Sequence, residues 1–375
     1  MSVRGEQLRL ATRGSDLARR QAMMVKERLS SRRLSVELVE VETTGDQLSD
    51  ELIHELGTTG AFVRSLDEKV LAGELDAAVH SMKDMPTEQP DELVVAGVPE
   101  RAPAGDVLVT PDGTPLAELP SGAVVGTSSL RRGAQLLADR PDLAIEPLRG
   151  NVDTRIEKLL APGLQREHER RLEAEADEKG EYDDIEETED VDEEFEQTAQ
   201  EWFDDLLEIE RQALGRKVDT EYDTICLAAA GLDRSGLLSK VEYEQLDPAS
   251  FVPAPAQGAI AVTALDGETA SRINELLDHP PSRIETTVER TILAELGGGC
   301  VAPVGIHARL RGEVVDVTAR VLSRDGTEEV MESRDLPVAR HAEAAREFAA
   351  DLADRGAATL IEQARRDQPD DPKRA

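Results

Sequence analysis

The sequence predicts an α/β protein that ends in a small α+β unit. In the first part of the chain, short apolar runs of strand length alternate with longer stretches of helical periodicity. This alternation is typical of βαβ units and of a mostly parallel sheet. The expected strands are residues 8–11, 36–41, 77–80 and 93–96, and the expected helices are residues 17–29 and 63–71.

The last hundred residues show a different order of elements. A helical pattern over residues 287–296 precedes two strand-like runs at 304–310 and 314–322, and a long helix is expected over about 341–365. The 375 residues are enough for two or three domains, each with its own core.

Composition excludes several classes of function. The formal net charge is −35, from 78 acidic and 43 basic side chains, whereas contact with nucleic-acid phosphates requires a basic face. Two cysteines make neither a disulfide framework nor a zinc site, so no metal is expected. No run of 18 apolar residues and no apolar leader is present, so we expect a cytoplasmic protein that does not enter membranes.

Acidic residues are concentrated in one block. Residues 166–210 hold 22 acidic and 4 basic side chains, about half of the net charge. Such a block repels itself and buries little, so we expect a solvated insertion, partly disordered or helical, outside the folded cores and the cleft. The remaining acids are spread evenly, which favours a halophilic and archaeal source over an ordinary acidic protein, because about 1 M salt shortens the Debye length to about 3 Å.

Cationic side chains gather at two predicted strand ends. Residues 126–132 (GTSSLRR) and 148–155 (LRGNVDTR) each follow an apolar run and precede a helical pattern. Hydroxyl groups, free backbone N–H groups and guanidinium groups therefore converge, which is the chemistry of an anion site. The alternative for either stretch alone is a solvated helix start, because Ser and Thr caps are common.

Two further features concern reactive side chains. Cys300 follows three glycines, where a bulky group can approach closely, so it is a candidate nucleophile or attachment point, whereas Cys226 lies in an apolar run and reads as core. Residues 77–86 form an apolar strand that ends in a polar turn, which places Lys83 and Asp84 at the edge where α/β sheets bind ligands. A surface ion pair is the alternative for these two residues.

Seven segments resemble the signature segments of the porphobilinogen deaminases, also called hydroxymethylbilane synthases. They occur in the family's order over about 290 residues, so the match is specific. The block that begins near Leu160 and ends near Val218 is foreign to the family pattern. The segments are residues 11–15, 80–84, 126–132, 148–155, 227–232, 257–259 and 298–300.

The resemblance implies a fold of three domains. Two are α/β lobes like those of periplasmic binding proteins, and the third is a small α+β domain that carries the cofactor cysteine on a loop. The implied first lobe comprises residues 1–100 and 257–276, the second lobe residues 101–256 with the insertion at about 160–218, and the third domain residues 277–375.

The resemblance also implies a reaction. Four porphobilinogen molecules are condensed stepwise, with release of ammonia, into the linear tetrapyrrole hydroxymethylbilane. Cys300 matches the cysteine that holds a dipyrromethane primer, one per chain, and Asp84 matches the catalytic carboxylate that stabilises the cation formed as ammonia leaves. The positions that match binding of substrate and cofactor carboxylates are Arg13, Ser15, Lys83, Thr127, Ser128, Ser129, Arg131, Arg132, Arg149, Gly150, Arg155 and Arg234.

The sequence departs from the family pattern at two positions. Thr44 and Thr59 stand where family lid loops commonly carry cations, and Arg64 is a possible substitute. We expect a monomer that passes its product to uroporphyrinogen-III synthase. A binding protein without turnover would share the fold, and an acidic interaction protein would explain only residues 166–210. An intact mass showing two pyrrole units on Cys300 decides for the enzyme.

Overall fold

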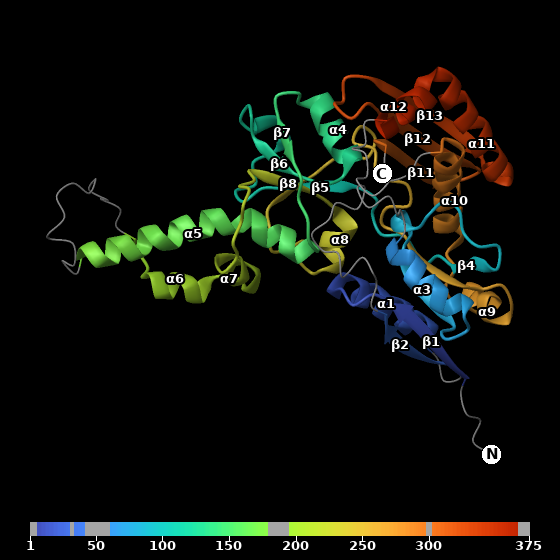
Figure 1. The fold of residues 1–375 in the computed structure, drawn as a ribbon, viewed down its shortest axis with the longest axis horizontal. Coiled ribbons are helices and arrows are strands. Elements are labelled where there is room, and N and C mark those ends of the chain that lie inside the picture. Colours follow the sequence, from blue (N-terminus) through green and yellow to red (C-terminus); the bar gives the residue numbers. More distant parts are fainter. Residues whose placement is uncertain (1–5, 31–33, 42–60, 179–194, 298–301, 367–375) are drawn as a thin grey trace, which may run out of the picture.

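The computed structural model describes residues 6–30, 34–41, 61–178, 195–297 and 302–366. These residues form three units, each built on its own sheet (Figure 1). Two units are α/β lobes with five-stranded sheets, and the third is a small α+β domain with a three-stranded sheet. The predicted fold class is confirmed.

The first lobe combines the N-terminal part of the chain with one later strand. Its sheet has the order β2-β1-β3-β10-β4. Ser15 begins α1 by accepting a hydrogen bond from the backbone N–H of Ala18. The elements are β1 (Glu6–Thr12), α1 (Asp16–Leu29), β2 (Leu34–Glu40), α3 (Ala61–Leu71), β3 (Ala77–Ser81), β4 (Leu93–Gly97), β10 (Ile260–Leu265) and α9 (Glu268–Leu277).

The second lobe is a continuous middle portion of the chain. Its sheet has the order β7-β6-β8-β5-β9. The strands are short, and the three inner strands β5, β6 and β8 are mostly buried, whereas the edge strands β7 and β9 are partly exposed. The elements are β5 (Asp106–Val109), β6 (Val124–Gly126), α4 (Leu130–Asp139), β7 (Ala144–Glu146), α5 (Val152–Glu178), α6 (Ala199–Asp205), α7 (Glu208–Leu214), β8 (Thr224–Ala228), α8 (Ala229–Arg234) and β9 (Tyr243–Gln245).

The expectation of mostly parallel sheets is wrong. In the first lobe β1 pairs parallel with β2 and β3, but β10 pairs antiparallel with both β3 and β4. In the second lobe β6 pairs parallel with β7 and β8, but β5 pairs antiparallel with β8 and β9. Strands β5 and β10 each follow a crossing of the chain between lobes, and they enter the sheet from the opposite end to the βαβ strands.

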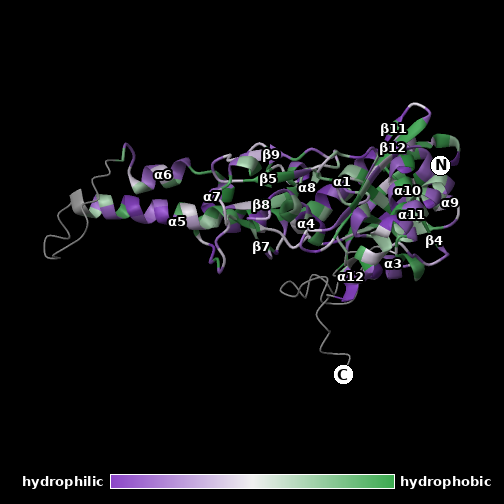
Figure 2. Cartoon of the chain, turned by 90° about the horizontal axis from the view of Figure 1, so that it is seen from above, coloured by the Kyte–Doolittle hydropathy of each residue, from purple (hydrophilic) through white to green (hydrophobic). Residues whose placement is uncertain are grey.

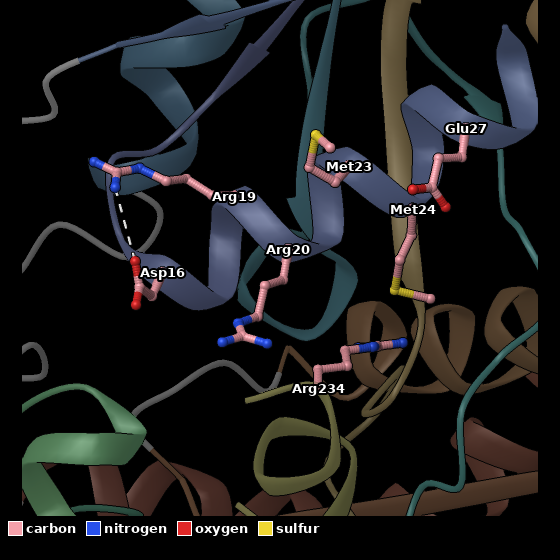
Figure 3. A pocket seen from close by; sticks show the side chains of 7 residues that line it. All are labelled: Asp16, Arg19, Arg20, Met23, Met24, Glu27 and Arg234. Carbon is pink, nitrogen blue, oxygen red and sulfur yellow. Dashed lines mark ion pairs between the residues drawn. The ribbon is translucent and has the colours of Figure 1, made fainter. Parts of the chain in front are cut away.

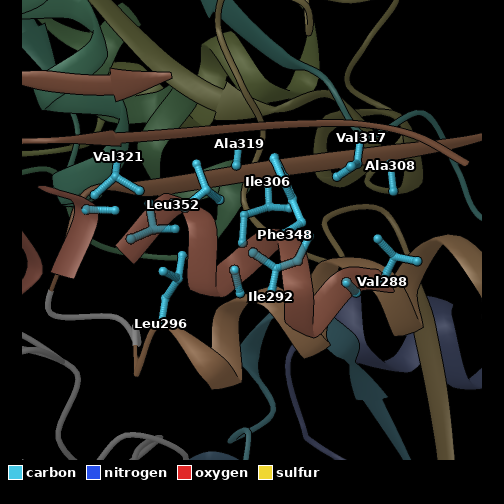
Figure 4. Close-up of a cluster of buried hydrophobic side chains, with 14 of the residues drawn as sticks. Val288, Ile292, Leu296, Ile306, Ala308, Val317, Ala319, Val321, Phe348 and Leu352 are labelled. Atoms are coloured by element: carbon cyan, nitrogen blue, oxygen red, sulfur yellow. The ribbon is translucent and has the colours of Figure 1, made fainter. Parts of the chain in front are cut away.

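The third domain packs helices on one face of an antiparallel sheet. The side chains of α10 and α11 meet β11 and β12 around Phe348, which is fully buried (Figure 4). Its elements are α10 (Pro280–Glu295), β11 (Val304–Arg311), β12 (Val314–Leu322), β13 (Glu329–Pro337), α11 (His341–Leu352) and α12 (Ala358–Arg366).

The long C-terminal helix expected over 341–365 is interrupted. A turn at Ala353–Ala357 separates α11 from α12, and Gly356 has a φ of 109° there. Only glycine adopts this backbone conformation readily, so the helix ends and restarts at this point.

The acidic block is partly helical, as expected, but it is not wholly outside the cores. The helix α5 projects from the second lobe and α6 lies beside it (Figures 1 and 2). Ile209 on α7 is buried in the second-lobe core with Ile156 and Leu159 of α5. We call α6 and the projecting part of α5 the arm. Trp202 of α6 holds the arm together, because its ring stacks on His168 and makes a cation–π contact with the Arg171 guanidinium. The most acidic part, residues 179–194, lies outside the described residues.

Within the described ranges, no helix has the length and apolar character needed to cross a membrane.

We predict that the projecting arm can be removed without unfolding the second lobe. Replacing residues 169–206 by a short Gly-Ser linker keeps Ile209. The free energy of unfolding should change little, because the entropy of loop closure depends weakly on loop length. By contrast, Ile209→Ala in the full chain should cost about 2–5 kcal/mol, since it leaves a cavity. Calorimetry in high salt measures both. A melting temperature that falls as far in the deletion variant as in Ile209→Ala would show that the arm supports the core.

Candidate active site

A short polar turn carries Lys83 and Asp84 at the end of β3. The turn is a single 3₁₀ turn, Met82–Asp84, with Met82 buried beneath it, Lys83 half-buried and Asp84 exposed. The Met82 N–H donates to the carbonyl of Ala259, which links the turn to the segment before β10. The sequence therefore predicted both the strand end and the polar turn.

Arg290 of α10 holds this turn from below. Its guanidinium donates to the carbonyl oxygens of Met82 at 3.3 Å, Met85 at 3.2 Å and Pro86 at 2.6 Å. Burial lowers the pKa of Arg290. A helix of the third domain thus fixes the backbone that presents Asp84, a role that sequence analysis missed because the acceptors are carbonyl groups some 205 residues away.

Arg131 and Arg132 converge on a buried carboxylate, Asp106. Arg131 Nη2 donates to Asp106 Oδ2 at 2.8 Å, and Arg132 donates to Oδ1 from Nε at 3.0 Å and from Nη2 at 2.7 Å. Gln257 Nε2 adds a fourth bond to Oδ1 at 2.9 Å. The sequence predicted carboxylate binding by both arginines, and the structure gives them a carboxylate of the protein itself.

The titration of this cluster follows from burial and neighbouring charge. Burial alone would raise the pKa of Asp106, but Arg131 and Arg132 outweigh it and the pKa lies below its ordinary value. Burial is the main reason that the pKa of Lys83 is lowered, and Arg131 and Arg132 lower it further. Lys83 of the first lobe therefore faces the arginines of the second lobe.

Arg149, Gly150 and Arg155 lie on the loop between β7 and α5 and on its first turn. Arg155 Nε donates to the Gly150 carbonyl at 2.8 Å. Gly150 has a φ of 112°, and a Cβ there would come within 2.5 Å of the Thr154 side chain, so only glycine fits. Arg149 Nη1 is buried and has no hydrogen-bond partner among the described residues.

Arg155 connects this loop electrostatically to Asp84. Burial lowers the pKa of Arg155 to about 10, and Arg132 lowers it further while Asp84 opposes the shift. The pKa of Arg132 is raised although burial opposes this, chiefly because of Asp106, and Asp84 adds a smaller contribution in the same direction. Asp84 and Lys83 of the first lobe therefore lie within electrostatic range of Arg132 of the second, and Asp84 also within range of Arg155.

The hydroxyl groups of the turn before α4 serve local structure. Ser128 Oγ donates to the Leu148 carbonyl at 2.8 Å, and Thr127 Oγ1 accepts from the Ser129 N–H at 3.2 Å. Ser129 is the N-cap of α4, and its side chain accepts from the Arg132 N–H. These groups shape the loop that presents Arg131 and Arg132.

The remaining predicted arginines lie at the ends of β1 and α8. Arg13 follows β1 and is half-buried, next to the N-cap Ser15. Arg234 ends α8 and donates from Nη2 to the Gly258 carbonyl at 2.7 Å, while its buried Nε has no hydrogen-bond partner among the residues described.

The two cysteines differ as far as they are described. Cys226 is buried in β8, and burial raises the pKa of its thiol to about 12, so it has no nucleophilic thiolate at neutral pH. Cys300, and the lid positions Thr44 and Thr59, lie outside the described residues. Arg64 on α3 is exposed.

An ion pair that the sequence did not reveal joins the third domain to the crossing segments. Arg101 donates to Glu289 from Nη1 at 2.8 Å and from Nη2 at 3.0 Å, and from Nε to the Gln257 carbonyl at 2.8 Å. Glu289 also accepts from the N–H groups of Ala256 at 2.6 Å and Ala308 at 2.7 Å. The bonded partners are between 19 and 188 residues apart in the sequence.

Two protein-family models match this chain. The model "Porphobilinogen deaminase, dipyromethane cofactor binding domain" matches residues 8–168 and 212–272, and "Porphobilinogen deaminase, C-terminal domain" matches residues 283–355. The first model leaves out residues 169–211, all but the last of which fall within the acidic block.

Similar proteins from archaea and bacteria carry the same name. A "Probable porphobilinogen deaminase" of Halobacterium salinarum is 53% identical over 96% of this chain and 98% of its own length. Another of Methanosarcina acetivorans is 38% identical over 95% of this chain and 94% of its own. A "Porphobilinogen deaminase" of Acidothermus cellulolyticus is 36% identical over 98% of this chain and 95% of its own.

Among solved structures, a periplasmic substrate-binding protein of an ABC transporter from Coxiella burnetii covers 72% of this chain and 89% of its own. Its TM-score of 0.35 and identity of 13% are too low to support an argument about function. The family models and the full-length relatives are sufficient: the chain belongs to the porphobilinogen deaminase family, whose cofactor is a dipyrromethane.

Proposed function

We propose that this protein joins four porphobilinogen molecules, one at a time and with loss of ammonia, into hydroxymethylbilane, with Asp84 as its catalytic carboxylate. The observation that carries the proposal is the position of Asp84. It is an exposed carboxylate at the end of β3, and its charge acts on Arg132 and Arg155 of the opposite lobe. An anion within electrostatic range of cations of the opposite lobe suits a reaction in which both substrate carboxylates and a transient cation must be held.

Asp84 would stabilise the positive charge that develops on the substrate pyrrole as ammonia leaves. A fixed carboxylate does this best when it does not have to reorient, and the three bonds from Arg290 to the turn provide that rigidity. Asp84 is also placed to hold the proton that ammonia requires as a leaving group.

The cationic groups around Asp84 fit the dipyrromethane and its substrate. Arg131 Nε and Arg149 Nη1 are buried donors without hydrogen-bond acceptors in the described part of the chain, which is costly unless a ligand supplies the acceptor. Acetate and propionate carboxylates of the pyrrole rings are such acceptors. When bound, the dipyrromethane supplies the free pyrrole carbon that the first porphobilinogen joins.

The cationic residues would have different roles in binding. Arg149, Arg155, Lys83 and Arg13 are candidates for direct contact with carboxylates. Arg131 and Arg132 already bind Asp106, so they would orient the N-terminus of α4 and offer their remaining donors. Thr127, Ser128, Ser129 and Gly150 would shape the two loops, with backbone N–H groups facing the anion.

Three further points remain predictions. Cys300 follows α10 in the sequence, ten residues after Arg290, so we expect the attachment point and the residue that holds the Asp84 turn to belong to one segment. We also expect a monomeric, cytoplasmic enzyme whose product passes to uroporphyrinogen-III synthase. The domain boundaries given above stay predictions as well.

The attachment point is tested by intact mass in high salt. Cys300→Ser should fold but carry no pyrrole units and show no turnover, because an alcohol is a far weaker nucleophile than a thiol near neutral pH. Cys226→Ser is the matched control and should keep the cofactor, since its thiol is buried. Two pyrrole units retained on Cys300→Ser would refute the assignment.

The role of Asp84 is tested by Asp84→Asn. This change keeps the shape and removes the anion, so we expect kcat to fall about 10²–10³-fold with little change in KM. Loss of an exposed ion pair with Lys83 would cost only about 1 kcal/mol or less. Mass must first show that the variant carries its dipyrromethane. A loaded variant that turns over within about threefold of the wild type rules out the catalytic role.

Arg290 is a positioning residue in this proposal. Arg290→Gln removes the donors that hold the carbonyls of the turn, and we expect kcat to fall about 10–100-fold, because a small misplacement of a catalytic group is expensive. KM should change little, and Arg290→Lys should restore part of the rate.

Arg283→Gln is the control for this variant. Arg283 lies on the same helix and binds Asp278 and the Val95 carbonyl, away from the turn. Equal losses of kcat in Arg283→Gln and Arg290→Gln at similar melting temperatures would reduce Arg290 to a structural residue.

A further inference from the structure

A second cationic pocket lies between the lobes, and of its lining residues only Arg234 belongs to the site described above. Its volume is about 350 Å³, and it is lined by α1 of the first lobe and by Arg234 at the end of α8 in the second. Arg20 extends from α1 toward the segment that carries Arg234 (Figure 3). The lining residues are Asp16, Arg19, Arg20, Met23, Met24, Glu27 and Arg234.

Two of the three arginines in this pocket, the exposed Arg20 and the more buried Arg234, have donors that no described residue accepts. Arg19 is committed to Glu40 at 2.8 Å and to Asp16 at 3.7 Å. Arg20 makes no hydrogen bond or ion pair with any described residue, and Arg234 has a buried Nε without a hydrogen-bond partner in the same part of the chain. In a protein with a net charge of −35, two guanidinium groups at one pocket that form no ion pair with a described residue favour an anionic ligand.

The same pocket offers apolar, polarisable contacts. Met23 and Met24 are 46% and 40% exposed on α1, although the chain buries most of its large apolar side chains. Thioethers pack favourably against aromatic rings. The two acidic residues of the pocket, Asp16 and Glu27, lie at opposite ends of the α1 segment that lines it (Figure 3). Arg20 and Arg234 lie between them, so the anionic part of a ligand would bind there. Cations beside thioethers match an aromatic ring that bears carboxylates.

Short chain segments link the pocket to residues of the candidate active site on both sides. The helix α1 begins directly after Arg13 and Ser15, two of the predicted carboxylate-binding positions. Arg234 donates to the Gly258 carbonyl, and the neighbouring Gln257 binds Asp106 between the two arginines of α4. Arg20 reaches across to the second lobe, since its Nη1 lies 3.8 Å from where a Cβ on Gly236 would be.

We propose that this pocket is a subsite for the elongated chain, in which Arg20 and Arg234 bind a carboxylate of a pyrrole unit that has moved away from Asp84, and Met23 and Met24 contact its ring. The inference rests on the proposed function, because it needs a growing pyrrole chain. It assigns Arg20 a role that begins only after the first units have been added.

The test follows the covalent intermediates by intact mass. Cofactor-loaded wild type, Arg20→Gln and Arg20→Glu are mixed with defined equivalents of porphobilinogen in high salt and quenched, and the species with one to four added units are quantified. We expect Arg20→Gln to lower the ratio of three- and four-unit to one- and two-unit species about tenfold, the value of one charge-assisted hydrogen bond. Arg20→Glu should lower it further, and neither variant should change the first addition.

Arg28→Gln is the matched control, because it removes the same charge from an exposed position on α1 that does not line the pocket. It should give the wild-type distribution. An unchanged distribution in both Arg20 variants, an equal loss of all species including the first, or the same loss in Arg28→Gln would overturn the subsite. A wild type that forms no pyrrole adducts at all would overturn the proposed function instead.

Discussion

The arrangement of the site depends on one buried carboxylate, Asp106. It is fully buried, and it accepts hydrogen bonds from Arg131, Arg132 and Gln257, which lie on α4 and on the segment that returns to the first lobe. Burying an unpaired charge would be prohibitive, so these partners are obligatory, and removal of one typically costs about 3–5 kcal/mol. Guanidinium groups suit the position because their fixed fork matches both carboxylate oxygens. The ends of α4 and β5 and the returning segment are thereby held at one point.

A second ion pair, between Arg101 and Glu289, joins the crossing segments to the third domain. Glu289 binds Arg101 by two bonds and also accepts from the N–H of Ala256, a residue with a φ of 59°. This left-handed conformation is costly for alanine and persists where the surroundings fix it. The next residue on α10 is Arg290, which holds the turn of Asp84. Two adjacent side chains of one helix thus connect the crossing segments and the candidate catalytic turn to the third domain.

Local patterns were sufficient for most elements but not for their assembly. Periodicity located α1, β3 and β12 to within a residue or two, because each buries one regular face. It could not reveal that β10 enters the first sheet antiparallel, since strand direction is set by where the chain returns from the second lobe. The site shows the same division. Motifs indicated Lys83, Asp84 and the arginines, whereas Asp106, Glu289 and Arg290 bind partners so distant in sequence that no local signal marks them. The sequence did not predict the burial of Ile209, because one apolar residue among acidic residues produces no periodic pattern.

Burial also explains how so acidic a protein can hold an acidic substrate. The 53% identical relative from Halobacterium salinarum supports a halophilic source, and at about 1 M salt the Debye length falls to about 3 Å. Exposed charges, such as those of the arm, are then screened from one another. Buried charges are screened far less, and the cations around Asp84 are mostly buried or half-buried. High salt therefore weakens the repulsion between the acidic surface and a carboxylate-bearing substrate more than it weakens the attraction of the cleft. The same logic accounts for the use of arginine, because a guanidinium group stays protonated on burial: even Arg155, whose pKa is lowered to about 10, keeps its charge at neutral pH.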